Sequence, residues 1–309
     1  MQIGLMMDSL TEMTLEAALD AAAALGIEAV EIPLGNWSPA PHVDFEALVA
    51  DPGARRRLVR EVESRGMTVD SLNASGNQLH PVSGPAETRV VEETIRIAGD
   101  LGITKVVMMS GLPAAPGDSM PNWVTTSWPA EVTALLEYQW TEVAIPWWHR
   151  LADHARACGV TRLALELHPN QLVYNVRSFR RLRAEVGELV GVNMDPSHLY
   201  WMGADPLAAI ADLGDAVYHV HAKDTRIEPL AAVDSCYETL PMEDWRHRAW
   251  NYVTLGHGQA GGVAYWRTFV ERLRSVGYDG ILAIEHEDAS MTQLEGVAES
   301  VRVLRGILG

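Results

Sequence analysis

The stretch RACGVTRLALELHP at residues 156–169 contains the unit that decides the fold. In it a helix-like segment ends at a glycine, a short apolar run follows, and the run ends at Glu166. The same junction recurs in AALGIEAV (23–30), ESRGMTVD (63–70), GDLGITKV (99–106) and RSVGYDGI (274–281). Glycine directly after a helix readily adopts the left-handed conformation of a C-cap. Five junctions of one type therefore indicate repeated helix–strand units.

Strand candidates and amphipathic helices alternate along the whole chain. The strand candidates are Ile3–Met6, Ala29–Ile32, Thr68–Leu72, Lys105–Met109, Leu163–Leu167, Val190–Met194, Val217–His221 and Ile281–Glu285. The helix candidates include Leu15–Leu25, Arg55–Arg65, Glu87–Leu101, Pro146–Cys158 and Ser178–Glu185. Short apolar runs between helices are typical of buried parallel strands. They predict an α/β fold with a single (β/α)8 TIM barrel over residues 1–309, rather than a doubly wound open sheet.

Composition and charge limit the classes of partner. The sequence has 41 acidic and 24 basic residues and a net charge of −17. Nucleic acids and anionic membranes favour basic surfaces, so we expect neither as a partner. No apolar run approaches the roughly 18 residues that cross a bilayer. The N-terminus MQIGLMMDSL lacks the pattern of a secretory signal, so we expect a cytoplasmic protein.

Two segments that follow strands are longer than simple connections. The first runs from Gly111 to about Trp148, and the second from Arg226 to about Gly262. Both would lie as long βα loops on the catalytic face of a barrel, where such loops act as lids or substrate walls. Their tryptophans either pack the loops onto the barrel or line the pocket, and we expect one or two to line it.

Four acidic or histidine side chains end or directly follow the later apolar runs. They are Glu166 after LAL, Asp195 after VGVNM, His221 after AVYHV and Glu285 after GILAI. The C-terminal ends of the strands of a parallel barrel converge on one mouth. Each residue taken alone is more often a rim or core residue, but four at one level are poorly explained by chance. Three carboxylates and one imidazole there predict a site for a divalent cation.

The blocks ELHP (166–169), DPSHL (195–199), HVHAKD (219–224) and IEHED (284–288) resemble the xylose isomerase-like TIM-barrel superfamily. Its members include sugar isomerases, ketose 3-epimerases and inosose dehydratases. The resemblance implies that Glu166, Asp195, His221 and Glu285 are the metal ligands. It also implies Mn²⁺ as the cofactor, with Mg²⁺ or Co²⁺ as substitutes, and an acid/base pair formed by Glu166 and Glu285.

One such site supports several reactions, and the sequence does not choose among them. A cation that chelates a carbonyl and its neighbouring hydroxyl acidifies the C–H between them and stabilises an enediolate. Return of the proton gives an epimer or an isomer of a keto sugar. Loss of a β-substituent instead gives a lyase, such as a dehydratase or the alpha-type subunit of a 3-keto-glycoside C-deglycosidase. The Trp-rich loops mildly favour the lyase, because aromatic walls suit an aryl aglycone.

The remaining candidates are substrate-binding residues. His198 matches a substrate-binding position in the DxxH motif of the superfamily, and His168 shares the strand face of Glu166. Lys223 and Asp224 bind sugar hydroxyls or form a structural ion pair. His80 walls the pocket or lies in a surface loop. We also name Arg226, near where relatives place an arginine, and His257, in a glycine-rich turn; with no cluster of Arg or Lys, we expect an unphosphorylated sugar or glycoside.

An endonuclease and a protein that only binds sugar are the other classes of function to compare with a metal-dependent sugar enzyme. The endonuclease branch of the superfamily needs more histidines and a basic face for DNA, and the net charge of −17 argues against it. A protein that only binds sugar would leave the four converging ligand-type residues without a role. From the resemblance we expect a homo-oligomer, and a hetero-oligomer with a small beta subunit is the alternative.

Overall fold

Eight parallel strands form a closed barrel in the computed structural model, which describes residues 1–309. In order around the barrel the strands are β1 (Gln2–Met6), β10 (Ile281–Ile284), β7 (Val217–Ala222), β6 (Val190–Met194), β5 (Arg162–Glu166), β4 (Lys105–Met108), β3 (Thr68–Asn73) and β2 (Ala29–Pro33). The barrel closes where β1 pairs with β10, from Gln2 opposite Ile281 to Leu5 opposite Ile284. The predicted α/β fold with a (β/α)8 barrel is confirmed, and the predicted strands match within one residue at each end.

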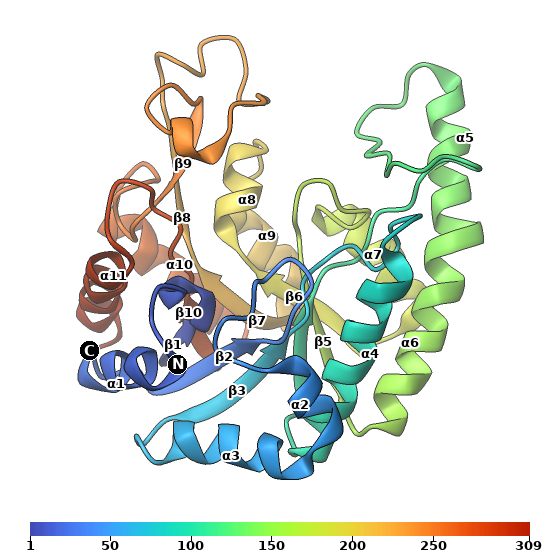
Figure 1. The fold of residues 1–309 in the computed structure, drawn as a ribbon. Helices are drawn as coiled ribbons and strands as arrows, with labels where there is room; N and C mark the ends of the chain where they lie inside the picture. The colour runs from blue at the N-terminus through green and yellow to red at the C-terminus, as the bar shows by residue number, and fades with distance from the viewer.

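Helices cover the outside of the barrel (Figure 1). They include α1 (Leu15–Ala24), α3 (Pro52–Glu63), α4 (Gly84–Asp100), α6 (Ile145–Ala157), α7 (Val176–Val186), α9 (Pro206–Leu213), α10 (Val263–Ser275) and α11 (Gln293–Leu308). Helix α7 shows why these segments are helical. Phe179, Leu182 and Val186 recur at helical spacing and are buried, while Asn175 and Ser178 form a capping box at its N-terminus.

The glycines at the predicted helix ends cap their helices as expected. Gly26, Gly66, Gly102, Gly159 and Gly277 all have positive φ, from 73° to 82°. At Gly159, for example, a residue with a side chain would pay the steric cost of the left-handed region. These glycines end each helix sharply and return the chain to the N-terminal end of the next strand.

The interior of the barrel contains polar side chains as well as apolar ones. Glu31, Asn73, Asn193, His219 and His221 lie on β2, β3, β6 and β7 and are all almost fully buried. Burial of so many polar groups is unfavourable unless they are paired with one another. The polar interior therefore indicates that the functional site lies on the axis of the barrel.

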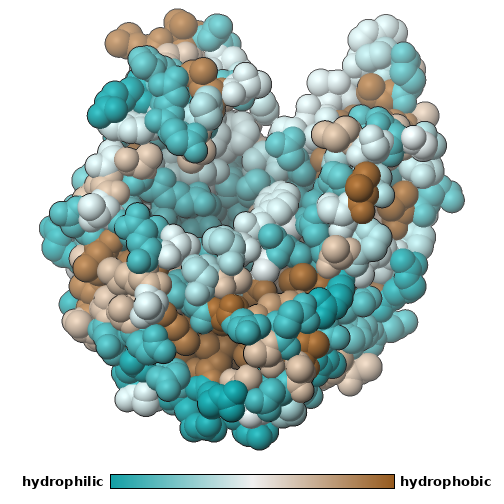
Figure 2. Space-filling view, viewed as in Figure 1, coloured by the Kyte–Doolittle hydropathy of each residue, from teal (hydrophilic) through white to brown (hydrophobic).

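The two long βα segments rise above the mouth of the barrel. Residues 111–144 carry α5 (Ala130–Tyr138) and a π-helix at Gln139–Ala144, and residues 224–253 form a hairpin of β8 (Asp224–Ile227) and β9 (Trp250–Val253). Figure 2 shows these parts as two raised lobes with a hollow between them. Two short helices, α2 (Phe45–Ala50) and α8 (Pro196–Trp201), lie after β2 and β6. No helix is long and apolar enough to cross a membrane.

Candidate metal centre and active-site cavity

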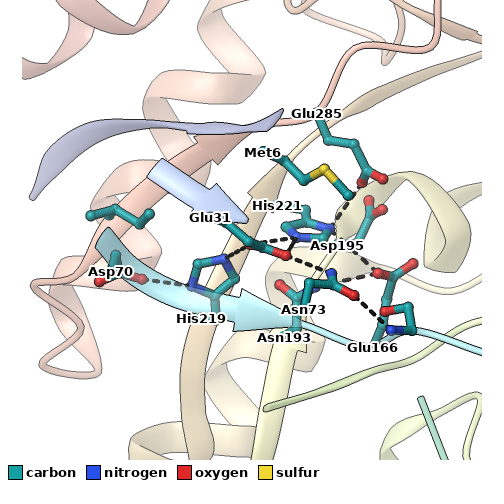
Figure 3. A network of polar contacts seen from close by, with 12 residues as sticks. Met6, Glu31, Asp70, Asn73, Glu166, Asn193, Asp195, His219, His221 and Glu285 are labelled. Carbon is teal, nitrogen blue, oxygen red and sulfur yellow. Dashed lines mark hydrogen bonds and ion pairs between the residues drawn. The ribbon is translucent and has the colours of Figure 1, made fainter. Parts of the chain in front are cut away.

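The four residues singled out as metal ligands come together at the mouth of the barrel (Figure 3). Glu166 ends β5, Asp195 directly follows β6 and caps α8, His221 lies near the end of β7, and Glu285 directly follows β10. One ligand atom from each lies within 4.8 Å of those of the other three. The convergence predicted from the strand ends is therefore present in the structure.

The atoms at the centre of this cluster suit a cation. Nδ1 of His221 lies 2.9 Å from Oε2 of Glu285 and 3.3 Å from Oε2 of Glu166. Nδ1 of His221, Oε2 of Glu285 and Oδ2 of Asp195 are buried and make no hydrogen bond of suitable geometry. Buried carboxylates gathered this closely are unfavourable unless positive charge lies between them. Three carboxylates and one imidazole around one point fit a divalent metal ion.

Electrostatics keep the two glutamates of the cluster, Glu166 and Glu285, ionised. Burial alone would raise the pKa of Glu285, but Lys223 and His221 lower it to about 2. Burial would likewise raise the pKa of Glu166, but His198 and His221 hold it well below its usual range. The pKa of His221 is raised well above its usual value because the attraction of Glu31 and Glu285 outweighs its burial. Without a metal, the His221 cation thus balances the carboxylates.

A buried carboxylate holds His221 from behind. Nε2 of His221 lies 3.0 Å from Oε2 of Glu31, and Nε2 of His219 lies 2.5 Å from the same oxygen. Asn73 donates to Oε1 of Glu31 at 2.6 Å. With Nε2 bonded to Glu31, the ring directs Nδ1 at the cluster. A carboxylate behind a histidine ligand is the usual means of fixing its tautomer and orientation.

The polar chain continues from Glu31 through the barrel interior toward the opposite end. Nδ1 of His219 lies 3.5 Å from Oδ2 of Asp70, and that oxygen lies 2.7 Å from Nζ of Lys105. Lys105 begins β4, so this ion pair sits at the N-terminal end of the strands. The interior is thus one connected network from the cluster to the far mouth.

A cavity of about 270 Å³ opens above the metal cluster. Of the predicted substrate-binding residues, His168, His198 and Lys223 line it. Nε2 of His198 lies 2.8 Å from Oε1 of Glu166, and its Nδ1 lies 3.0 Å from the hydroxyl of Tyr252. The rings of His168 and His198 are 4.2 Å apart. Burial next to His198 lowers the pKa of His168 to about 3, so His168 is a neutral imidazole.

Lys223 is the only lysine or arginine that lines the cavity. Its Nζ lies 2.9 Å from Glu285, 3.2 Å from Asp195 and 3.4 Å from Glu287. Burial would lower the pKa of Lys223, but these carboxylates raise it well above its usual value. The ammonium group also lies 4.6 Å from the ring centre of Tyr252. Lys223 therefore contributes a fixed positive charge at the edge of the cluster.

Four predicted substrate-binding residues lie outside the cavity. Asp224 is buried and accepts hydrogen bonds from the N–H groups of residues 225, 256, 258 and 259 and from the indole of Trp266. His80 accepts from the backbone of its own turn. His257 contacts Glu299, and Arg226 pairs with Glu228 beside a smaller neighbouring pocket. These contacts hold the loops that carry the four residues in place.

The tryptophans of the long segments also lie elsewhere. Trp140 of the π-helix and Trp147 and Trp148 of α6 are buried. Trp128 is 80% exposed, and Trp250 stacks on Trp201. None of them lines the cavity, so the expectation that one or two would do so is wrong. The cavity is instead lined by Trp37, from the connection after β2.

Sequence reasoning did not single out Asp8, Tyr252 or Glu287 as substrate-facing, yet all three line the cavity. Glu287 follows Glu285 by two residues, so strand parity was a usable signal. Asp8 lies in a 3-10 helix at Met7–Leu10 directly after β1, and Tyr252 lies in the unpredicted hairpin strand β9. Asp8 directly follows the apolar run of residues 3–7, so the signal that marks Asp195 and Glu285 was present there as well, whereas no apolar run ends at Tyr252 and no motif includes it.

Comparison with known proteins places this chain in a family. The profile of the xylose isomerase-like TIM barrel matches residues 19–307. The chain belongs to this family. It is 44% identical over 310 residues to the uncharacterized protein YfiH of Bacillus subtilis (strain 168), an alignment that covers 99% of this chain and 98% of YfiH.

Solved structures share the fold of this family member at low sequence identity. The IolI protein, solved with a zinc atom, superposes with a TM-score of 0.70 at 17% identity, covering all of this chain and 98% of IolI. D-Psicose 3-epimerase from Clostridium cellulolyticum H10, solved with D-tagatose, gives a TM-score of 0.65 at 15% identity, covering all of this chain and 98% of the epimerase. Structural neighbours of the chain thus include sugar-modifying enzymes.

Proposed function

We propose that the protein is a divalent-metal-dependent isomerase or epimerase that acts on a keto sugar through an enediolate. One observation carries the proposal: Glu166 and Glu285 both approach Nδ1 of His221, from strands three positions apart in the barrel. Two ionised carboxylates on different sides of one point can act on different faces of a bound sugar. The family membership agrees with such a reaction.

The metal ligands in this proposal are Glu166, Asp195, His221 and Glu285. When bound, the cation would polarise the carbonyl and the neighbouring hydroxyl of the sugar and stabilise the charge of the enediolate. Three carboxylates with one imidazole suit Mn²⁺, with Mg²⁺ or Co²⁺ as substitutes. Zinc, which is bound in IolI, is the further candidate.

Glu166 and Glu285 provide the acid and the base. Their pKa values are low, so both are ionised at neutral pH and each can accept a proton from carbon. One glutamate removes the proton next to the carbonyl. If the other takes up a proton from solvent and delivers it to the opposite face of that carbon, the product is an epimer. If a proton returns to the neighbouring carbon, the product is an isomer.

The cavity favours an unphosphorylated sugar. Lys223 is its only basic side chain apart from histidines, and it already contacts Asp195, Glu285 and Glu287. A phosphate group would therefore find no free cation. His168 and His198 can donate or accept hydrogen bonds with sugar hydroxyls, and Trp37 adds an aromatic side chain to the lining.

A lyase that acts on an oxidised sugar is the second candidate. The argument from tryptophans and an aryl aglycone does not support it, because those tryptophans lie outside the cavity. A different observation favours it: the cavity contains Asp8, a carboxyl without a cationic partner, which suits the protonation of a leaving group. The two reactions share the first step, removal of the proton next to the carbonyl.

Exchange of that proton with solvent tests the shared step. Metal-loaded protein is incubated in D₂O with a panel of ketoses and 3-keto-glycosides, and deuterium at the carbon next to the carbonyl is followed by NMR. We expect exchange that is lost on treatment with EDTA and that falls by at least ~100-fold in Glu166→Gln and Glu285→Gln. Near-normal exchange in both variants would refute the assignment, and the product identifies an epimerase, an isomerase or a lyase.

A further inference from the structure

We propose that Asp8 is a third acid–base residue of this cavity, one that donates a proton to an oxygen of the bound sugar while Glu166 and Glu285 act on carbon. The proposal rests on the proposed function, because it assumes an enediolate in the same cavity. It concerns the second candidate reaction, elimination from the shared enediolate, in which an oxygen leaves as a hydroxyl group that must be protonated.

The position of Asp8 supports this role. Strand β1 lies four positions from β5 in the barrel of eight strands, so Asp8 and Glu166 stand on opposite walls. Strand β1 pairs with β10, which places Asp8 on the same side of the barrel as Glu285. Asp8 therefore lines the cavity from the wall opposite Glu166. Oδ1 of Asp8 is buried and has no hydrogen-bond partner in the protein.

Asp8 differs from the other carboxyl groups that line the cavity because it has no cationic partner. Glu166 lies 2.8 Å from His198, Glu285 lies 2.9 Å from Lys223, and Glu287 lies 3.4 Å from Lys223. Asp8 has no lysine, arginine or histidine within ion-pairing distance. A carboxyl that is partly buried, without a cation and close to carboxylates is more stable with its proton.

The surroundings of Asp8 shift its pKa in the direction that proton donation needs. Burial raises the pKa most, and the charges of Glu285, Glu31 and Glu287 raise it further, against the hydrogen bond from the hydroxyl of Ser38. The resulting pKa is about 6, whereas the pKa of Glu285 is about 2. Two carboxyl groups in one site whose pKa values differ this much are typical of a general acid and a general base.

The chemistry balances without a further reactant. Glu166 or Glu285 takes the proton from the carbon next to the carbonyl, and the electron pair of that C–H bond forms the enediolate. The pair then moves to form a carbon–carbon double bond as the bond to the β-oxygen breaks. Asp8 transfers its proton to that oxygen, and water leaves. The proton on the glutamate returns through solvent to the Asp8 carboxylate, so the sugar has lost one water and nothing is oxidised or reduced.

The test compares two leaving groups in wild type and Asp8→Asn. One substrate is a keto sugar with a β-hydroxyl that shows proton exchange, and the other is its β-fluoro analogue, whose fluoride leaves without a proton. We expect Asp8→Asn to lower kcat for loss of the hydroxyl by ~10²–10⁴-fold. Release of fluoride should fall much less than loss of the hydroxyl, and Asp8→Glu should restore part of the loss.

A pH profile provides a second readout. Because Asp8 donates a proton, wild-type kcat for loss of the hydroxyl should fall as the pH rises through the pKa of Asp8, which burial raises above its ordinary value. In Asp8→Asn, kcat for the hydroxyl substrate should not show this fall with rising pH. The matched control is Asp234→Asn, which changes an exposed aspartate that has no ion pair, and it should behave as wild type.

The outcomes separate the two proposals. Exchange in wild type without any elimination, equal losses for both leaving groups, or a normal rate for Asp8→Asn would overturn the role of Asp8 and leave the metal-dependent enolisation standing. Absence of exchange in wild type with every keto sugar would overturn the proposed function, and the role of Asp8 with it.

Discussion

Glu31 and His221 are joined by a buried contact of 3.0 Å between a carboxylate oxygen and Nε2, on the side of the imidazole that faces away from the metal cluster. The same oxygen of Glu31 contacts His219, and Asn73 holds the other oxygen. The carboxylate is completely buried, and its pKa is well below the usual value because the two histidines outweigh its burial. Glu31 therefore orients a metal ligand without touching the metal site.

Removal of this charge should weaken metal binding. Glu31→Gln keeps the shape of the side chain but loses the negative charge that holds the Nε2–H of His221. We expect the Kd for Mn²⁺ to rise about 10–100-fold, as for other residues that support a ligand. Calorimetric titration of metal-free protein measures it. Glu63→Gln, on the exposed face of α3, is the control, and a Kd for Glu31→Gln within twofold of that control would refute the role.

Metal affinity should increase with pH. In the metal-free protein the pKa of His221 is raised well above 6.5, so the ring is protonated at neutral pH. A metal that binds Nδ1 must displace this proton, and binding is therefore weaker at lower pH and strengthens as the pH approaches that pKa. Titration at neutral pH in buffers of different ionisation enthalpy should show release of about one proton per metal. Binding without proton release would contradict the assignment of His221 as a ligand.

His198 should act on the substrate rather than on the metal. It lines the cavity and is fixed by Glu166 and Tyr252, but it lies outside the group of four ligands. His198→Ala should raise KM or lower kcat for the active sugar by about tenfold or more while the metal content stays near that of wild type. Loss of the metal in this variant would instead make His198 a ligand.

Asp224 should matter for stability and not for the site. Its carboxylate gathers four backbone N–H groups and the indole of Trp266, and it fastens the glycine-rich turn that contains His257. Asp224→Asn replaces one accepting oxygen with a donor, and we expect about 1–3 kcal/mol lower free energy of unfolding in urea. The Kd for metal should not change by more than about twofold. Unchanged stability with weakened metal binding would show that Asp224 belongs to the site after all.

The parts of the fold that the sequence predicts are those with regular patterns. Apolar runs define the eight strands because both faces of a barrel strand are buried, and glycines such as Gly159 mark the helix ends through a backbone conformation that other residues avoid. Glu166, Asp195 and Glu285 were found for the same reason, since each directly ends or follows such a run. The parallel topology then brings distant residues together.

The residues that sequence reasoning misplaced lie in irregular segments. The hairpin of β8 and β9 depends on pairing across more than twenty residues, and no local pattern indicates it. Asp224 looks like a cavity residue from its place after β7, but the chain turns there and directs its side chain at the loop of residues 256–259. Asp8 was missed although it directly follows the first apolar run, and the closure of β1 against β10 places it on the side of Glu285.

Metal titration of the metal-free protein tests the central claim most directly. Purified protein is stripped with EDTA and titrated with Mn²⁺, alongside Asp195→Ala and His221→Ala as site variants and Glu63→Ala as the surface control. We predict one site per chain in the wild type and the control, and at least ~100-fold weaker binding in both site variants. Equal binding by all four proteins, or no binding by the wild type, would show that Glu166, Asp195, His221 and Glu285 do not form a metal centre.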